Sequence, residues 1–256
     1  MENKSNTIRQ AQGKKVFVGL SGGVDSSVAA LLLKNDGYNV VGVHLRCWNK
    51  DGCDERDAED ARRVADKLEI PFYVLDMEKE YKKLVVDYMI EGYKNGITPN
   101  PDVACNREIK FGLFLKKALS MGADYIATGH YVELRQETSN RGQGIYHLFE
   151  AKDKNKDQSY FLWTLTQDQL KHALFPIGDL TKPEVRKIAE DAGLPTANKK
   201  DSQGICFIGK VTLKDFLEEY LPKKRGNALT TSGEILGTHE GAHFFTIGQR
   251  HGIGIS

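Results

Sequence analysis

The hexapeptide Ser-Gly-Gly-Val-Asp-Ser at residues 21–26 is the part of this sequence best suited to hold a reactant. It follows the apolar run 16–20 and precedes the apolar run 27–33, a pattern that predicts a strand, a tight loop and a helix. Such a loop presents free backbone N–H groups at a helix N-terminus, which suits a phosphate group. Gly22 and Gly23 lack a Cβ atom and allow close approach of the anion, while Ser26 or Ser27 is expected to cap the helix.

The hexapeptide differs from two commoner phosphate-binding sequences. No Gly-Lys-Ser or Gly-Lys-Thr follows it, so it is not a Walker A loop, and it lacks the Gly-x-Gly-x-x-Gly pattern of dinucleotide-binding loops. An ordinary glycine-rich turn is the alternative interpretation, because glycine pairs are common turn signals. The serines on both sides of the glycines favour phosphate binding.

Two cysteines are candidates for chemistry because both fall in expected loops. Cys105, in Asn-Pro-Asp-Val-Ala-Cys-Asn at 100–106, is expected at a loop-to-helix junction, where a helix N-terminus lowers a thiol pKa below its usual value of about 8.5. Cys206 lies beside a glycine in Asp-Ser-Gln-Gly-Ile-Cys-Phe-Ile-Gly at 201–209. A loop cysteine is nevertheless more often inert than catalytic, so these residues alone leave both interpretations open.

The other two cysteines, Cys47 and Cys53, lie near His44 and raise the question of a metal site. Their spacing fits no common zinc or haem motif, and we interpret them as incidental thiols. No metal ligand set is predicted.

The elements that position these residues alternate between strand and helix. Strands are expected at residues 16–20, 40–45, 72–75 and 125–128, and helices at 55–68, 78–94 and 109–121. Two prolines place residues 96–101 in a loop. This rhythm predicts an α/β fold with a parallel sheet and helices on both faces. Ligands of such sheets bind at the carboxyl ends of the strands, where the segments after Leu20, Leu45 and Thr128 would meet.

The second half of the chain has a different pattern. Residues 132–134 and 146–150 predict a hairpin, and Thr181-Lys-Pro-Glu184 predicts a capping box that opens a helix ending near Gly193. Another helix is expected to start at 212–215, followed by short strands at 234–236 and 244–247. We therefore expect a disordered tail at 1–13, a catalytic domain at 14–210 and a small, partial β-containing domain at 211–256.

Composition sets broad limits on function. The chain is 40% hydrophobic and 28% charged, and no apolar run approaches the roughly 20 residues of a membrane span. The polar N-terminus does not resemble a signal peptide, so we expect a cytoplasmic protein without a membrane partner. We also expect the protein to be a monomer. The net charge of +1 neither requires nor excludes a nucleic-acid partner.

Five motifs in this order resemble one family. They are SGGVDS at 21–26, NPDVACN at 100–106, ATGHY at 127–131, KDQSYFL at 156–162 and DSQGICFIG at 201–209. The first resembles the PP-loop of ATP pyrophosphatases, and together the motifs are similar to those of the bacterial and mitochondrial tRNA 2-thiouridylase family. The resemblance runs from about Lys14 to the last residue. It implies an adenine nucleotide alpha hydrolase-like catalytic domain and a tRNA-uridine 2-sulfurtransferase that uses ATP with Mg²⁺.

The resemblance also implies roles for individual residues. It makes Cys206 the persulfide carrier and Cys105 the second catalytic cysteine, and it places the target base at Asn100, Pro101 and Asp102 and a tRNA contact at Lys156, Asp157 and Gln158. The ATP contacts that it implies are Gly19, Leu20, Ser21, Gly22, Gly23, Val24, Asp25, Ser26, Leu45 and Gly129.

The implied reaction activates a poor leaving group. ATP adenylates the C2 oxygen of the wobble uridine in tRNAs for lysine, glutamate and glutamine, with loss of pyrophosphate. Sulfur from the Cys206 persulfide then replaces AMP, leaving a disulfide with Cys105, or Cys105 frees hydrosulfide that attacks instead. The implied partners are tRNA and a sulfur donor, either a cysteine desulfurase or a sulfur-relay protein. An iron–sulfur cluster would need a ligand beyond these two cysteines.

Lysine-rich segments are candidates to extend a phosphate-binding surface. They are Lys152 with Lys154, the pair 199–200 and the run 223–225. A solvated surface is the alternative for any single lysine.

Family members usually continue past residue 254 into a C-terminal β-barrel, so we expect this chain to contain a shortened central domain and no barrel. Two rival functions remain open at this stage. One is another PP-loop ATP-dependent ligase, in which both cysteines are incidental. The other is a truncated, non-catalytic tRNA-binding module.

Overall fold

The computed structural model describes residues 13–48, 54–138, 144–201 and 211–249. Residues 1–12 of the tail expected at 1–13, Cys53, and the segment 202–210 with Cys206 lie outside these ranges. No helix in the described ranges is long and apolar enough to cross a membrane.

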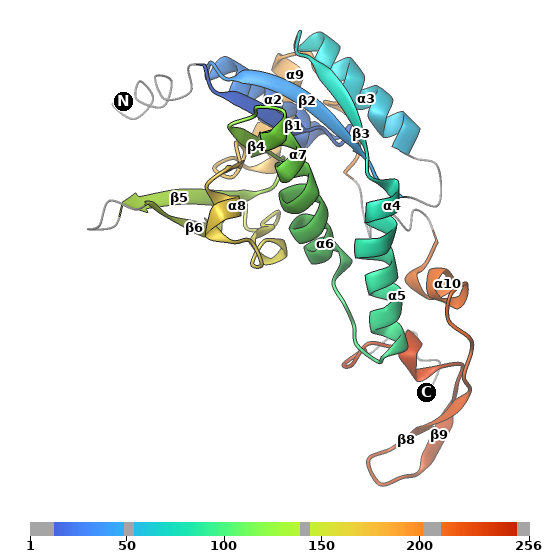
Figure 1. The fold of residues 1–256 in the computed structure, drawn as a ribbon. Coiled ribbons are helices and arrows are strands. Elements are labelled where there is room, and N and C mark those ends of the chain that lie inside the picture. The colour runs from blue at the N-terminus through green and yellow to red at the C-terminus, as the bar shows by residue number, and fades with distance from the viewer. Residues whose placement is uncertain (1–12, 49–53, 139–143, 202–210, 250–256) are drawn as a thin grey trace.

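A five-stranded parallel sheet forms the centre of the protein (Figure 1). Its order is β3-β2-β1-β4-β7, and all neighbours run parallel. The strands are β1 (Lys15–Gly19), β2 (Asn39–Arg46), β3 (Phe72–Asp76), β4 (Tyr125–Ala127) and β7 (Ala173–Leu174). The predicted α/β fold class and the four predicted strands are confirmed, whereas the two-residue β7 was too short to show a sequence pattern.

Helices cover both faces of this sheet, as strand β1 illustrates. Val16 and Val18 point into one core cluster with helices α2 (Val24–Asn35), α3 (Asp54–Lys67) and α9 (Lys182–Asp191). Phe17 points into a second cluster on the opposite face. Successive side chains of a strand alternate between faces, so an unbroken apolar strand requires cover on both sides.

The second face is covered by two long helical segments that pack against each other. The first contains α4 (Glu78–Tyr81), the π-helical stretch η1 (Lys82–Val86) and α5 (Asp87–Lys94), and it matches the helix predicted at 78–94. The second contains α6 (Pro101–Ala104), the π-helical stretch η2 (Cys105–Phe114) and α7 (Leu115–Ser120).

The predicted start of that second helix, residue 109, was wrong. The Oδ1 atom of Asn100 accepts hydrogen bonds from the backbone N–H groups of Asp102 and Val103, at 3.0 and 3.1 Å, and Pro101 occupies the first helical position. Proline is tolerated there because the N–H that it lacks has no helical partner. The loop prediction excluded prolines from helix interiors and overlooked this start signal.

An antiparallel hairpin follows β4, as predicted. It consists of β5 (Val132–Thr138) and β6 (Gly144–Glu150), and η3 (Ser159–Phe161) and α8 (Gln167–Leu170) lie between it and β7. The predicted capping box is also present, since Thr181 and Glu184 bond each other's backbone at the start of α9.

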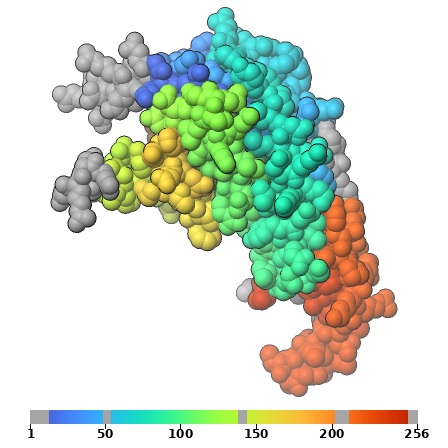
Figure 2. All heavy atoms as spheres, in the orientation of Figure 1, coloured from blue at the N-terminus to red at the C-terminus, as the bar shows by residue number. Residues whose placement is uncertain are grey.

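The C-terminal part begins with α10 (Leu213–Glu218), whose predicted cap Thr212 accepts a hydrogen bond from the Asp215 N–H at 3.1 Å. A hairpin of β8 (Gly226–Leu229) and β9 (Ile235–His239) follows and extends away from the body (Figure 2). The strand predicted at 244–247 was wrong, because Phe244 ends the short helix η4 (Ala242–Phe244) and packs into the second core cluster. The domain boundary near residue 210 stays a prediction.

Candidate nucleotide and sulfur-transfer site

The loop at 21–26 joins β1 to α2 at the carboxyl end of the sheet. Gly22 adopts a φ of +74°, and a Cβ atom there would lie 2.4 Å from the carbonyl oxygen of Asp57. Glycine is therefore required by the backbone conformation and by the contact with α3.

The first turn of α2 is open to an anion. Gly23 is its N-cap and supplies no side-chain hydrogen bond, and the amide groups of a first helical turn have no acceptor within the helix. The predicted caps were wrong, because the Ser27 hydroxyl donates back to the Gly23 carbonyl at 2.7 Å and the Ser26 hydroxyl does so at 3.3 Å. These amide groups therefore remain available for phosphate oxygens.

The loop lies where the strand order changes direction, between β1 and β4. Gly129, just after β4, packs directly against it: a Cβ at Gly129 would lie 2.5 Å from the Ser26 nitrogen. Leu45 lies near the end of the other neighbouring strand, β2, and is partly buried. The structure thus brings the predicted ATP-contact segments together at the switch point, the usual ligand crevice of open α/β sheets.

His44 is buried beneath this loop, and both of its ring nitrogens are within hydrogen-bonding distance of a protein oxygen. Its Nδ1 atom lies 2.9 Å from the Leu20 carbonyl oxygen, and its Nε2 atom lies 3.1 Å from Asp54 Oδ1. Both hydrogen bonds would have to break before His44 could bind a metal, and the interpretation of Cys47 as an incidental thiol stays a prediction. No group of three or more His, Cys, Asp or Glu side chains in the described ranges is arranged to hold a metal ion.

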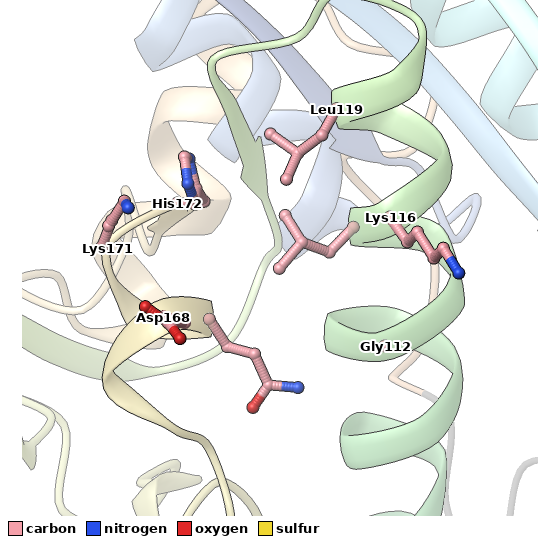
Figure 3. A pocket seen from close by; sticks show the side chains of 8 residues that line it. Gly112, Lys116, Leu119, Asp168, Lys171 and His172 are labelled. Atoms are coloured by element: carbon pink, nitrogen blue, oxygen red, sulfur yellow. The ribbon is translucent and has the colours of Figure 1, made fainter.

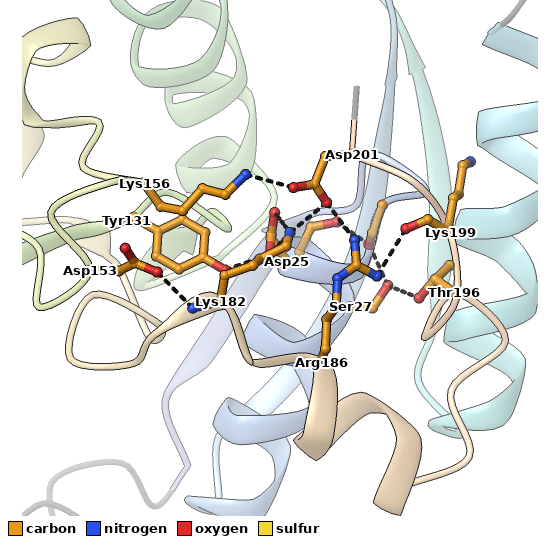
Figure 4. Close-up of polar contacts among 12 residues, drawn as sticks. Asp25, Ser27, Tyr131, Asp153, Lys156, Lys182, Arg186, Thr196, Lys199 and Asp201 are labelled. Carbon is orange, nitrogen blue, oxygen red and sulfur yellow. Dashed lines mark hydrogen bonds and ion pairs between the residues drawn. The ribbon is translucent and has the colours of Figure 1, made fainter. Parts of the chain in front are cut away.

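Asp25, the acidic residue of the loop, is the first member of a charged network (Figure 4). The Lys182 ammonium group donates to both of its carboxylate oxygens, at 2.8 and 2.9 Å. The Tyr131 hydroxyl donates to Oδ1 at 2.8 Å. Burial, followed by the charge of Asp25, raises the pKa of Tyr131 far above its usual value, so the phenol stays protonated as a donor.

Asp201 is the second carboxylate of this network (Figure 4). Lys182 lies 2.8 Å from it, and Lys156 and Arg186 donate to it at 2.7 Å each. Burial acts to raise the pKa of Asp201, but the ammonium groups of Lys156 and Lys182 outweigh it and lower this pKa to about 2. The carboxylate is therefore ionised at neutral pH. Asp201 is also the last described residue before the segment that contains Cys206.

Two residues of α9 in this network were not predicted from the sequence: Lys182, which bonds both carboxylates, and Arg186, which bonds Asp201. Neither lies in the five motifs, and only the capping box marked the helix that carries them. The sequence offered no further signal for them, because the need of Lys182 for an anionic partner follows from its burial, with 8% of the residue exposed, and burial is visible only in the structure.

Cys105 lies inside the second helical segment, at the first residue of η2, and is partly buried. Its predicted place at a loop-to-helix junction was wrong, because the helix begins four residues earlier, at Pro101. The influence of a helix N-terminus falls off within the first turn, so that argument for an activated thiol does not apply. Asp102 remains in the first turn, and burial raises its pKa despite the opposing charge of Lys110.

The stretch predicted to contact tRNA makes internal bonds. Besides the pair between Lys156 and Asp201, the Asp157 carboxylate accepts from the Ala151 N–H at 2.8 Å, and Gln158 Oε1 accepts from the Tyr131 N–H at 3.0 Å. These contacts hold the loop in place, and the tRNA contact stays a prediction.

Each of the lysine clusters contains a lysine that is paired with a carboxylate. Lys152 pairs with Glu184, Lys154 with Glu150, Lys199 with Asp57 and Asp60, and Lys223 with Glu218 and Glu240. A phosphate-binding role for these lysines therefore requires competition with acidic neighbours.

A groove between α7 and α8 has no part in this site (Figure 3). Leu119, His172 and other residues line it near the start of β4, where His172 bonds the Asp124 carbonyl oxygen at 2.8 Å. This is the amino end of the sheet, opposite the loop at 21–26.

A parallel sheet with this strand order, and a Ser-Gly-Gly-Val-Asp-Ser loop opening the helix after β1, define an α/β protein of the PP-loop nucleotide-binding class. The sequence matches the family described as tRNA methyl transferase HUP domain over residues 14–210 and the one described as tRNA methyl transferase PRC-barrel domain over residues 214–256. The chain belongs to the tRNA-specific 2-thiouridylase family, as three relatives that carry this name, with the suffix MnmA, illustrate.

The relative from Akkermansia muciniphila is 54% identical over 248 residues, which cover 94% of this chain and 68% of that protein. The one from Christiangramia forsetii is 50% identical over 94% of this chain and 71% of its own length, and the one from Lactococcus lactis is 53% identical over 94% and 64%. The chain thus spans about two thirds of these relatives.

A solved structure supports the fold alone. The NMN synthetase of Francisella tularensis is 17% identical and superposes with a TM-score of 0.50, covering 84% of this chain and 79% of that one.

Proposed function

We propose that this chain is an ATP-dependent tRNA-uridine 2-sulfurtransferase that converts the wobble uridine of lysine, glutamate and glutamine tRNAs to 2-thiouridine, releasing AMP and pyrophosphate. Family membership supports the activity. The observation that carries it is the bonded network of Asp25, Tyr131, Lys156 and Asp201, because it joins four of the five motifs at the carboxyl end of the sheet.

ATP binds at the β1–α2 loop in this proposal. The open amide groups of the first turn of α2 and the Ser21 hydroxyl receive phosphate oxygens, and Leu45 and Gly129 border the nucleotide from the neighbouring strands. Mg²⁺ accompanies the nucleotide and shares the phosphate charge. Lys182 keeps Asp25 paired while the loop holds the anion.

The target uridine leaves the anticodon stack and enters near the start of α6. The side-chain oxygen Oδ1 of Asn100 accepts the two capping hydrogen bonds, so Asn100 and Pro101 shape the entrance. The raised pKa of the partly buried Asp102 suits a group that exchanges a proton with the base.

Sulfur transfer follows activation. The outer sulfur of a Cys206 persulfide attacks C2, and AMP leaves with the electron pair of the C2–O bond. The Cys105 thiolate then attacks Cys206 Sγ, which forms a disulfide and leaves sulfur on C2. A cellular thiol reductant returns both cysteines to thiols, and a cysteine desulfurase or sulfur-relay protein reloads Cys206. Hydrosulfide released by Cys105 is the variant route.

The decisive experiment is mass spectrometry of nucleosides from unmodified lysine or glutamate tRNA incubated with the protein, Mg-ATP, a thiol reductant, and a cysteine desulfurase with cysteine as the sulfur source. ATP-dependent 2-thiouridine supports the proposal. Pyrophosphate release that needs no tRNA would instead indicate another PP-loop ligase, and tRNA binding without sulfur incorporation would indicate a binding module.

A further inference from the structure

The loop after β6 is held rigidly against the helix that carries Cys105. Gln158 bonds both backbone groups of Tyr131, donating through its own N–H at 2.9 Å and accepting through Oε1 at 3.0 Å. The side-chain amide of Asn106, the residue after Cys105, donates to the Phe161 carbonyl oxygen at 3.3 Å. Leu162 is fully buried. The loop is therefore anchored at several points along its length.

Two large aromatic rings nevertheless point into solvent from this loop. Tyr160 is 59% exposed and Trp163 is 75% exposed. The backbone closes successive i to i+3 hydrogen bonds here, from Phe161 to Gln158 and from Leu162 to Ser159. Tyr160 lies in η3, and Trp163 follows two residues after the end of that helix, so both rings belong to one short segment of the anchored loop. The centres of the Phe161 and Tyr160 rings lie 4.0 Å apart, so the two rings pack against each other.

A lysine precedes these rings on the same loop. The Lys156 side chain is 39% exposed, although it pairs with Asp201 at 2.7 Å. An exposed aromatic surface with a lysine on the same loop is complementary to unpaired nucleotides, whose bases stack while their phosphates carry negative charge.

We propose that Tyr160 and Trp163 form a stacking platform for unpaired bases of the RNA substrate next to the target uridine. The inference rests on the proposed function and specifies how that site recognises its substrate. Base–aromatic stacking tolerates any base, so the platform orders the anticodon loop without reading its sequence. A second copy of this chain, or a protein segment, is the competing occupant.

The fluorescence of Trp163 can report whether RNA binds at the platform. The protein has two tryptophans, and the partly buried Trp48 packs against Phe216 of the second core cluster. In a Trp48→Phe variant, all tryptophan emission comes from Trp163. The probes are an anticodon stem-loop RNA with a wobble uridine and a blunt RNA duplex of matched length and charge.

We expect the stem-loop to quench Trp163 emission and to protect it from acrylamide, and the duplex to do neither at equal occupancy. Trp163→Ala and Tyr160→Ala should each weaken stem-loop binding roughly 5- to 100-fold by filter binding. The matched control Tyr73→Ala, which removes a 48% exposed ring on edge strand β3, should leave binding unchanged.

Several results would overturn the platform. If the stem-loop binds but leaves Trp163 emission and acrylamide access unchanged, the platform is rejected while the proposed function stands. If Trp163 is already shielded without RNA in a concentration-dependent way, the platform is a protein interface. If neither RNA binds, the proposed substrate class fails for this chain, and the platform fails with it.

Discussion

The ammonium nitrogen of Lys182 lies 2.8 and 2.9 Å from the two carboxylate oxygens of Asp25, although 157 positions separate the two residues. The same nitrogen lies 2.8 Å from Asp201. A single side chain from α9 thus joins the PP-loop to the residue that leads into the second cysteine motif.

Lys182→Met should destabilise the protein and weaken nucleotide binding. It leaves Asp25 without its cation partner, and breaking a buried pair in this way costs about 3 kcal/mol. Urea unfolding and calorimetric titration with ATP measure the two effects. The control Lys187→Met removes an exposed lysine from the same helix and should change neither. An unchanged midpoint for Lys182→Met would contradict the inferred role of the pair.

The ion pairs of Asp201 should make the free energy of unfolding sensitive to acid. The pKa of Asp201 is lowered to about 2 in the folded protein, from an ordinary value of 3.8. A carboxylate with a depressed folded-state pKa contributes stability above its unfolded value and loses it as pH falls through the folded value. The stability difference between the wild type and Asp201→Asn should therefore be constant above pH of about 4 and shrink between about 4 and about 2. Unfolding curves across this range measure it, and a difference independent of pH would refute the ion pairing.

Gly129→Ala should separate the segment after β4 from the phosphate-binding loop. The new Cβ would lie 2.5 Å from the Ser26 nitrogen and 2.7 Å from the Asp25 carbonyl carbon, so the backbone has to move. Overpacking of this kind costs about 1–3 kcal/mol. Thermal unfolding measures the loss. Gly19→Ala is the comparison, because its Cβ would make only ordinary contacts, at 3.7 and 3.8 Å, and it should retain most of the stability.

Cys105→Ser and Cys206→Ser should each abolish thiolation and leave ATP binding largely intact. The two thiols handle sulfur, whereas the phosphate-binding loop is built from other residues. Nucleoside mass spectrometry and calorimetry measure the two properties. Cys47→Ser is the control, because Cys47 packs at the edge of the core and has no proposed role. Thiolation that persists in Cys105→Ser or Cys206→Ser would exclude the proposed sulfur route.

Much of the fold was predictable because it depends on local patterns. The apolar runs at β1, β2, β3 and β4 and the capping residues Thr181 and Thr212 specify elements from nearby sequence alone. The errors arose where one local rule competed with another. Pro101 opens a helix instead of breaking one, and Ser26 and Ser27 bond back to Gly23 instead of capping α2.

The sequence by itself determined the glycine-rich loop between the first strand and helix, the alternation of strands and helices, and the family, because short-range backbone preferences and motif order carry that information. Only the tertiary structure decided that Lys182 and Arg186 belong to the site and that Lys156 pairs with Asp201. It also decided that Trp163 is exposed while Leu162, its neighbour, is buried. Partners of charged side chains and the burial of single residues depend on contacts between distant segments, and those contacts form only when the chain folds.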